Sequence, residues 1–221
     1  MKKKIGKLIV FDAIDGAGKT TQVKLLLNHL RREKIKYYLT DFPQYEKSFF
    51  GKMVRQYLQG AFGEVGKTDP HLISLLYALD RFEAKKRMWK ILKSGRVIVS
   101  DRYSPANKIH QASKIKNIRR KDEFLDWLDK VEFGILGIPR PDLVLFLDVP
   151  PKITMAMTAR RGKQDLHESS LRHQQAAYQE SLRLVNKYSA WKKIECLSHG
   201  NLLSPEKIHE RVWAEVKKVS K

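Results

Sequence analysis

Short apolar runs alternate with longer amphipathic segments along most of the chain. Apolar runs of strand length lie at Leu8–Phe11, Tyr37–Thr40, Val97–Ser100, Leu143–Leu147 and Ile194–Leu197. Segments with helical spacing lie at Thr20–Glu33, Lys47–Gln59, Leu72–Lys93, Asp122–Glu132, Ile153–Arg160, Glu168–Lys187 and Pro205–Val219. This alternation is typical of parallel βαβ units. We therefore expect an α/β fold with a doubly wound, five-stranded parallel sheet flanked by helices.

The residues directly after each expected strand are the first candidates for a functional site, because ligands of doubly wound sheets bind beyond the carboxyl ends of the strands. These residues are Asp12 to Lys19, Asp41 to Tyr45, Asp101 to Tyr103, and Asp148. No repeat, low-complexity tract or linker divides the sequence, and we expect residues 1–221 to form a single domain.

The first expected strand leads directly into a glycine-containing loop. Residues 12–21 read Asp-Ala-Ile-Asp-Gly-Ala-Gly-Lys-Thr-Thr, and a leucine-rich helical pattern follows. This order is that of the phosphate-binding pattern G-x-x-x-x-G-K-[ST], in which backbone N–H groups and a helix N-terminus face the phosphates. Lys19 supplies a mobile positive charge, and Thr20 offers a hydroxyl to Mg²⁺. The predicted nucleotide-binding residues are Asp15, Gly16, Ala17, Gly18, Lys19, Thr20 and Thr21.

Two residues of this loop are unusual. Ala13 stands where the pattern begins with Gly, which an alanine can replace if its φ is negative. Asp15 places a carboxylate beside the expected phosphates, where it is repulsive unless it points elsewhere. Either Asp15 caps the following helix, or it faces a second substrate. For the loop as a whole, the alternative is a surface turn that caps a helix.

Asp101 and Asp148 are two of the aspartates that directly follow an expected strand. Asp101 follows Val97–Ser100, the position where a P-loop protein places an acid near Mg²⁺. Arg102 is suited to clamping an acceptor phosphate, although a local ion pair at the strand end is the alternative. Asp148 ends Leu143–Leu147 in the same way, so spacing alone does not identify the metal-side acid. Because Val-Pro-Pro follows Asp148, a capping role is open for it.

A basic segment from Thr158 to Glu168 follows the next expected helix. Arg160, Arg161 and Lys163 surround a glycine, and two acids come after them. Cations on a segment that closes over bound substrates stabilise the charge of a transferring phosphoryl group. We expect a short mobile lid at about residues 158–168, with a solvated basic loop as the alternative.

Positive charge dominates the composition: 44 Lys and Arg against 24 Asp and Glu give a net charge of +20. One interpretation is a surface that binds nucleic acid. The other is an enzyme of anionic small molecules, whose substrates such a charge concentrates. The basic residues are spread along the chain, and only Lys114–Lys121 forms a dense cluster. We expect this cluster to be a solvated loop or helix face. Because the other basic residues are spread along the chain, we do not expect a nucleic-acid partner.

A single cysteine, Cys196, excludes an internal disulfide and suits a reducing compartment. No uninterrupted apolar stretch reaches the roughly 18 residues of a membrane span, and the apolar run after Met1 is too short for a signal peptide. We expect a cytoplasmic protein without a membrane partner.

Further motifs extend along the chain: Phe42-Pro43, Leu76-Tyr-Ala-Leu-Asp-Arg81, Asp101-Arg-Tyr103, His110-Gln111 and Pro139-Arg-Pro-Asp-Leu-Val-Leu145. In this order and spacing, together with the phosphate loop, they resemble the thymidylate kinase family, P-loop enzymes that phosphorylate dTMP from ATP. The resemblance runs from Ile9 to about Val219. It implies the P-loop fold, ATP and Mg²⁺ as cofactors, dTMP as the substrate, and a homodimer.

The resemblance implies roles for the residues on the phosphate side. Arg102 would hold the monophosphate, with Asp101 and Thr20 on the Mg²⁺ side. Asp15 would accept a hydrogen bond from the 3′-hydroxyl of the deoxyribose. Lys19 and Arg102 are then catalytic residues of the transfer.

On the nucleoside side, the resemblance implies that Tyr77 stacks on thymine, Arg81 reads the base edge and Phe42 packs beside the nucleoside. Without the resemblance, Tyr77 and Arg81 are one helical turn apart and equally suit a core aromatic with a neighbouring ion pair. The resemblance also implies that Asn107, His110 and Gln111 line the sugar and base.

Two departures from the family pattern affect the site. Gln44 and Tyr45 occupy the stretch where members often have a second arginine for the monophosphate, so Tyr45, Lys47, Lys52 or Arg55 would take its role. Gly16 stands where one subgroup has a catalytic arginine, which places this chain with the subgroup that uses lid arginines. The lid arginines are Arg160 and Arg161.

Three other functions compete with this interpretation. A P-loop kinase of another nucleoside monophosphate has the same chemistry and differs only in its acceptor. A basic nucleic-acid-binding ATPase is suggested by the net charge. A relative that binds nucleotides without turnover is suggested by Ala13 and by the altered stretch at Gln44 and Tyr45.

Overall fold

A computed structural model describes residues 5–64, 68–159 and 168–219 of the chain. Its main sheet has five parallel strands in the order β2-β3-β1-β4-β5. The strands are β1 (Leu8–Asp12), β2 (Tyr37–Asp41), β3 (Val97–Asp101), β4 (Leu143–Asp148) and β5 (Trp191–Glu195). The sequence prediction of a doubly wound α/β sheet is thus confirmed.

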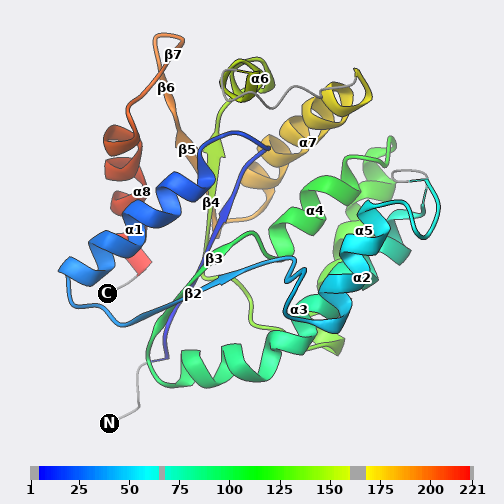
Figure 1. Cartoon of the computed structure of the whole chain (residues 1–221), viewed down its shortest axis with the longest axis horizontal. Coiled ribbons are helices and arrows are strands. Elements are labelled where there is room, and N and C mark those ends of the chain that lie inside the picture. Colours follow the sequence, from blue (N-terminus) through cyan, green and yellow to red (C-terminus); the bar gives the residue numbers. More distant parts are fainter. Residues whose placement is uncertain (1–4, 65–67, 160–167, 220–221) are drawn as a thin grey trace.

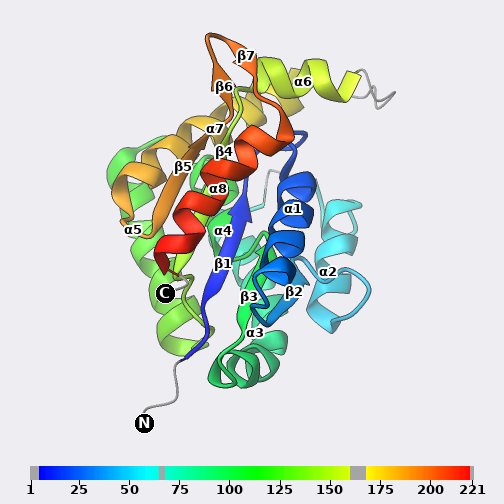
Figure 2. The ribbon, with the colours of Figure 1, turned by 90° about the vertical axis from the view of Figure 1, so that its left-hand side faces the viewer.

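Helices cover both faces of the sheet. On one face lie α1 (Lys19–Arg32) and α8 (Pro205–Val219), which pack against each other (Figures 1 and 2). On the other face lie α3 (Pro70–Lys93), α4 (Ser104–Ala112) and α7 (Glu168–Lys187). The remaining elements are α2 (Phe49–Leu58) beside α3, α5 (Ile118–Asp129), the π-helix η1 (Lys130–Ile135), α6 (Pro151–Ala159), and the hairpin β6 (Leu197–Ser198) and β7 (Asn201–Leu202).

Three elements differ from the sequence prediction. The last strand lies at Trp191–Glu195 rather than Ile194–Leu197, because only Trp191 and Ile194 of this edge strand are buried and no continuous apolar run marks it. Helix α4 was not predicted, although Pro105 lies in its first turn, where proline fits a helix. The helix expected at Asp122–Glu132 is α5, which starts earlier, followed by the π-helical turn η1.

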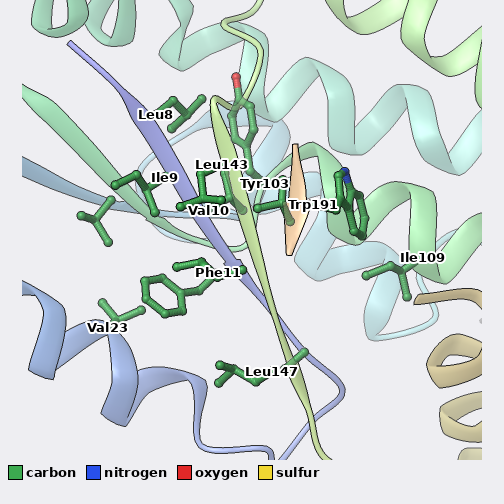
Figure 3. Packing of buried hydrophobic residues seen from close by; sticks show 14 of the residues in the cluster. Leu8, Ile9, Val10, Phe11, Val23, Tyr103, Ile109, Leu143, Leu147 and Trp191 are labelled. Atoms are coloured by element: carbon green, nitrogen blue, oxygen red, sulfur yellow. The ribbon is translucent and has the colours of Figure 1, made fainter. Parts of the chain in front are cut away.

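The core lies between the sheet and its two helical layers (Figure 3). Every residue of β1 is buried, as expected for a central parallel strand with helices on both sides. Val23 of α1 packs on one face of the sheet, and Tyr103 and Ile109 lie in the same apolar cluster. This core fixes the carboxyl ends of the strands, from which the loops of the site emerge. No helix among the described residues is long and apolar enough to cross a membrane.

Candidate active site

The loop between β1 and α1 has the geometry of an anion site. Gly16 and Gly18 have φ values of 84° and 83°, in the left-handed region that favours glycine. Ala13 is not among the described residues with positive φ, so it has the negative φ that the sequence interpretation requires. No side chain of the described chain caps the N-terminus of α1. Its free N–H groups and helix dipole therefore favour a bound anion.

The loop encloses a cavity of about 250 Å³, lined by residues 14–21. Thr20 is exposed at this cavity, and the Lys19 Nζ forms an ion pair with Asp101 at the end of the neighbouring strand β3. The strand that carries Asp101 lies beside the phosphate-loop strand, since β1 pairs in parallel with β3. A lysine, a hydroxyl and a carboxylate thus lie together at one end of the sheet.

Asp148, the aspartate at the end of β4, has different neighbours from Asp101. Its carboxylate accepts a hydrogen bond from Tyr178 Oη at 2.7 Å and lies 3.5 Å from Lys193 Nζ. Among the described contacts, Asp101 is therefore the strand-end acid that meets the phosphate-loop lysine.

A larger cavity of about 680 Å³ lies beside the phosphate loop. Its walls come from the loop after β1, the segment after β2, and helices α2, α3, α4 and α7. All of the residues predicted to contact the second substrate line it: Asp15, Phe42, Tyr77, Arg81, Arg102, Asn107, His110 and Gln111.

The two cavities meet at Ile14 and Asp15, which line both. Asp15 forms an ion pair with Arg102 and does not cap α1, so the capping alternative for Asp15 is wrong. The side chain of Asp15 is 68% exposed and that of Arg102 is 25% exposed. Partial desolvation opposes both charges, but each group stabilises the other: the pKa of Asp15 is lowered and that of Arg102 is raised. Arg102 has a φ of 62°, and its backbone N–H donates to Phe11 O at 3.0 Å. This backbone conformation places the guanidinium at the boundary between the cavities.

Asp12 lies beneath this boundary and is fully buried. Burial raises the pKa of its carboxyl to about 6, although Arg102 and Lys19 act in the opposite direction. Its Oδ1 accepts a hydrogen bond from Ala13 N at 2.9 Å, whereas Oδ2 has no partner among the described residues. A buried acid close to Lys19 and Arg102 adds negative potential under a site that otherwise presents cations.

The segment after β2 is held by Asp80 of α3. Asp80 accepts hydrogen bonds from Gln44 N at 3.0 Å and from Ser48 Oγ at 2.5 Å. The Gln44 side chain bonds inward, to Thr40 Oγ1 at 3.2 Å and to Arg87 at 3.3 Å. Gln44 therefore supports the segment and does not line the cavity.

Of the four candidates to replace the second arginine, Tyr45 lines the cavity. Lys47 pairs instead with Asp41 at 3.2 Å, and Arg55 pairs with Glu46. Lys52 is exposed and is not part of the cavity wall.

Two residues of α3 face the cavity one helical turn apart. Burial raises the pKa of the Tyr77 phenol, which stays protonated at neutral pH. Arg81 is only 2% exposed and forms an ion pair with the fully buried Glu132 of η1. Arg81 thus forms an ion pair, as the alternative interpretation expected, and it also lies in the cavity wall, as the resemblance implied.

His110 lies on the cavity wall, half-buried and in a cationic environment. Burial, Arg102 and His173 lower the pKa of His110 to about 3, so its imidazole is neutral. Its Nδ1 lies 3.3 Å from Nε2 of His173, and the two rings are stacked. Lys114, His173 and Gln174 line the same cavity and were not predicted. Lys114 belongs to the basic cluster that we expected to be solvated, and for this residue the expectation is wrong. His173 and Gln174 carried no sequence signal, because which face of a helix meets a cavity depends on tertiary packing.

The lid arginines Arg160 and Arg161 lie outside the described residues. The described chain ends on one side of them with α6 and resumes on the other with α7.

Comparison with known proteins gives a consistent result. A family model described as "Thymidylate kinase" matches residues 11–201. The chain is 30% identical over 214 residues to a probable thymidylate kinase of Pyrococcus horikoshii, covering 96% of each chain. It is 28% identical over 220 residues to a thymidylate kinase of Caenorhabditis elegans, covering 96% of this chain and 91% of that one. The solved structure of a thymidylate kinase from Candida albicans superimposes with a TM-score of 0.72 at 22% identity, covering 98% of this chain and 94% of that one. This last likeness concerns the fold.

Proposed function

The chain belongs to the thymidylate kinase family, and from this premise we infer how its two cavities divide the reaction. The enzyme phosphorylates dTMP to dTDP in deoxynucleotide biosynthesis. We propose that ATP binds with its phosphates in the 250 Å³ cavity and that dTMP binds in the 680 Å³ cavity. The observation that carries this division is that Ile14 and Asp15 line both cavities, so two bound ligands would meet there.

On the donor side, the loop amides that have no backbone acceptor and the N-terminus of α1 bind the phosphates. Lys19 exchanges its ion pair with Asp101 for the phosphate oxygens, which carry more negative charge. Lys19 thereby stabilises the charge that spreads over the transferred phosphoryl group.

The oxygen donors near Lys19 fit Mg²⁺, a hard cation that prefers oxygen ligands and keeps several waters. Thr20 presents an exposed hydroxyl, and the side chain of Asp101 is 23% exposed. The described residues contain no group of three or more His, Cys, Asp and Glu side chains that could hold a metal by itself. This suits an ion that shares its ligands with a nucleotide: Thr20 and Asp101 would hold it. When bound, Mg²⁺ neutralises charge on the donor phosphates.

On the acceptor side, Arg102 binds the 5′-phosphate of dTMP and Asp15 accepts a hydrogen bond from the deoxyribose. The present ion pair between them supports these roles, because it holds an anion-binding group and a hydroxyl-binding group side by side. Tyr77 stacks on the base and Phe42 packs beside it. The remaining contacts to the sugar and base come from Arg81, Asn107, His110 and Gln111.

The transfer needs no general base, because the acceptor oxygen belongs to a phosphate whose second pKa is about 6 and is therefore anionic near neutral pH. Catalysis then rests on position and positive charge. Lys19 and Arg102 supply this charge, and from the sequence we add Arg160 and Arg161 on the lid. Lid closure would also exclude water and so limit ATP hydrolysis.

We further propose a cytoplasmic homodimer. Phe49 of α2 is 68% exposed and Phe82 of the adjoining α3 is 41% exposed. Large apolar side chains exposed on neighbouring helices support a contact with a second copy of the chain. Light scattering of the purified protein tests this, and a monomer at micromolar concentration would contradict it.

The test of the activity is a coupled assay of ADP formation with ATP and a panel of nucleoside monophosphates. We expect turnover with dTMP and much slower turnover with dCMP or purine monophosphates. Absence of ADP formation with dTMP, where another monophosphate is phosphorylated, would overturn the substrate. Absence with every monophosphate would indicate a protein that binds nucleotides without turnover.

A further inference from the structure

A fully buried acid behind the wall of the acceptor cavity connects two residues of that wall. Glu132 has 0% of its surface exposed and lies in the π-helix η1. Its Oε1 accepts hydrogen bonds from Arg81 Nη2 and, at 3.1 Å, from Asn107 Nδ2. Arg81 lies on α3 and Asn107 on α4, and both line the cavity, whereas Glu132 does not. One carboxylate thus holds two wall residues from different helices.

These contacts determine which way the Asn107 amide points. Its Nδ2 lies 3.1 Å from the carbonyl oxygen of Ser74 and 3.1 Å from Glu132 Oε1. Both partners only accept hydrogen bonds, so the amino group must occupy this position; a flipped amide would set its oxygen against two acceptors. The Asn107 Oδ1 is consequently the atom left over, and it has no partner among the described residues.

Glu132 also accounts for a charged arginine in the cavity wall. Arg81 is 2% exposed, and a buried guanidinium without a counter-charge is strongly destabilising. Its Nη2 is committed to Glu132, while its Nε has no partner in the described chain. Arg81 therefore retains donors for a further acceptor, with its guanidinium 5.8 Å from the centre of the Tyr103 ring.

We propose that Glu132 is a positioning residue for the acceptor base. It holds Arg81 as a hydrogen-bond donor and Asn107 as a hydrogen-bond acceptor in the cavity wall. A thymine edge carries carbonyl acceptors beside a ring N–H donor, whereas a cytosine edge carries an amino donor. A wall that presents Arg81 as the donor and Asn107 as the acceptor matches the thymine edge. The same wall sets Arg81 against the amino group of cytosine. The π-helical turn supports this role, since such turns occur frequently at functional sites.

The inference rests on the proposed acceptor site, and its test is Glu132→Gln. Glutamine has nearly the size of glutamate but is uncharged. Its side chain offers one oxygen and one amino group in place of the carboxylate that now accepts from Arg81 and Asn107. We expect the KM for dTMP to rise about tenfold or more, as for the loss of hydrogen bonds to a charged group. We expect kcat and the KM for ATP to stay within about twofold, because the contacts to the base are the same in the bound substrate and in the transition state. The preference for dTMP over dCMP should fall with the same variant.

The matched control is Glu180→Gln. Glu180 is 2% exposed and pairs with Lys121 at 2.8 Å and Arg183 at 2.7 Å, but it is not part of the cavity wall. This variant also loses a buried, doubly paired carboxylate, so a fall in Tm without a change in the KM for dTMP is expected. If Glu132→Gln does not fold, Glu132→Asp keeps the buried charge and shortens only its reach. It should raise the KM for dTMP and leave the KM for ATP unchanged.

An unchanged KM for dTMP in a folded Glu132 variant would overturn the inference, as would an equal rise in the KM for ATP. Arg81→Lys separates this failure from failure of the proposed site. If Arg81→Lys raises the KM for dTMP and the Glu132 variants do not, the site stands and the role of Glu132 is wrong. If Arg81→Lys leaves that KM unchanged, the proposed acceptor site is itself wrong.

Discussion

At the scale of single residues, the Asp15–Arg102 ion pair is the feature that joins the two cavities. Arg102 is also the one cavity-lining cation whose own backbone is left-handed, with a φ of 62°, in the part of the chain that the structure describes. A hydrogen bond from its N–H to Phe11 O ties this conformation to the central strand β1. The backbone position of Arg102 is therefore fixed by the central strand of the sheet, and the ion pair with Asp15 orients its guanidinium.

Replacing Arg102 by alanine should lower kcat/KM for dTMP on the order of 10²–10³-fold, the effect of removing one preorganised electrostatic group. The slow hydrolysis of ATP without dTMP should change little, since Arg102 belongs to the acceptor side. Steady-state kinetics with varied dTMP and saturating ATP measure this. A kcat/KM within threefold of the original enzyme would exclude Arg102 as the monophosphate ligand.

The phosphate loop offers a test of backbone conformation alone. A Cβ at Gly18 would meet no atom within 4 Å, but its φ of 83° is strained for alanine. Gly18→Ala should therefore cost about 1–2 kcal/mol of stability and raise the KM for ATP, because relief of the strain moves the amides that face the phosphates. Chemical denaturation and kinetics measure the two effects.

Gly200→Ala is the matched control, since Gly200 has a φ of 78° and the same empty surroundings in the β6–β7 hairpin. It should lose similar stability and leave the KM for ATP unchanged. Equal effects of both substitutions on that KM would contradict a phosphate-binding role of the loop.

Sequence reasoning at the residue scale succeeded where the chemistry is local. The phosphate loop, from Ala13 to Lys19, is contiguous, so its glycines, lysine and strand-to-helix context are visible in one window. Glu132 and His173 were missed because they act from helices distant in sequence from the loop. Gln44 was seen as a departure, but its inward bonds to Thr40 and Arg87 follow only from the folded chain.

At the scale of elements, histidines connect α1 to α8. His29 Nδ1 lies 3.0 Å from His209 Nε2, and the His29 ring stacks on Trp213 at 3.8 Å. Burial lowers the pKa of both histidines, with Arg32 acting in the same direction and Glu33 opposing it at His29. The packing of these two helices thus requires neutral imidazoles.

Stability should consequently fall as the pH drops below about 6.5, the ordinary value for histidine. In this window the unfolded chain binds protons that the folded chain does not, and each such histidine costs up to about 1.4 kcal/mol per pH unit. His110, whose pKa is lowered to about 3, contributes in the same direction. Asp12, whose pKa is raised to about 6, acts oppositely because the folded chain takes up its proton first.

Urea unfolding at pH 7.5 and 5.5 measures this dependence, and His209→Gln isolates the contribution of the α1–α8 contact. The variant should lose less stability between the two pH values than the original chain. An equal loss in both would show that the pKa of His209 does not differ between the folded and the unfolded chain, which contradicts this contribution.

The prediction of elements was wrong in two places: where a strand buries only some of its residues, and where an α-helix continues as a π-helix. β5 is an edge strand with two exposed lysines between its buried Trp191 and Ile194, so its pattern does not form an apolar run. The passage from α5 into the π-helix η1 breaks the 3.6-residue period on which helix prediction depends. Both failures leave the prediction of a doubly wound, five-stranded parallel sheet intact, because that prediction rests on the alternation of strands and helices.

At the scale of the whole molecule, the central claim is that the two cavities form one continuous site. The phosphate loop supplies the shared boundary, with Ile14 and Asp15 in both walls. The net charge of +20 favours this site as a whole, since both ligands and the product are polyanions. The residues of the ATP cavity could be predicted from the phosphate loop itself, and those of the dTMP cavity from the resemblance to the thymidylate kinase family. That the two cavities share wall residues could be seen only in the folded chain.

The most direct measurement uses a bisubstrate analogue in which adenosine and thymidine are joined by a chain of phosphates. Its inhibition is measured against varied ATP and against varied dTMP, with the original enzyme and with Arg102→Ala. We expect inhibition that is competitive with both substrates and that is weakened by the substitution. Inhibition competitive with only one substrate would contradict a continuous site at Asp15 and Arg102.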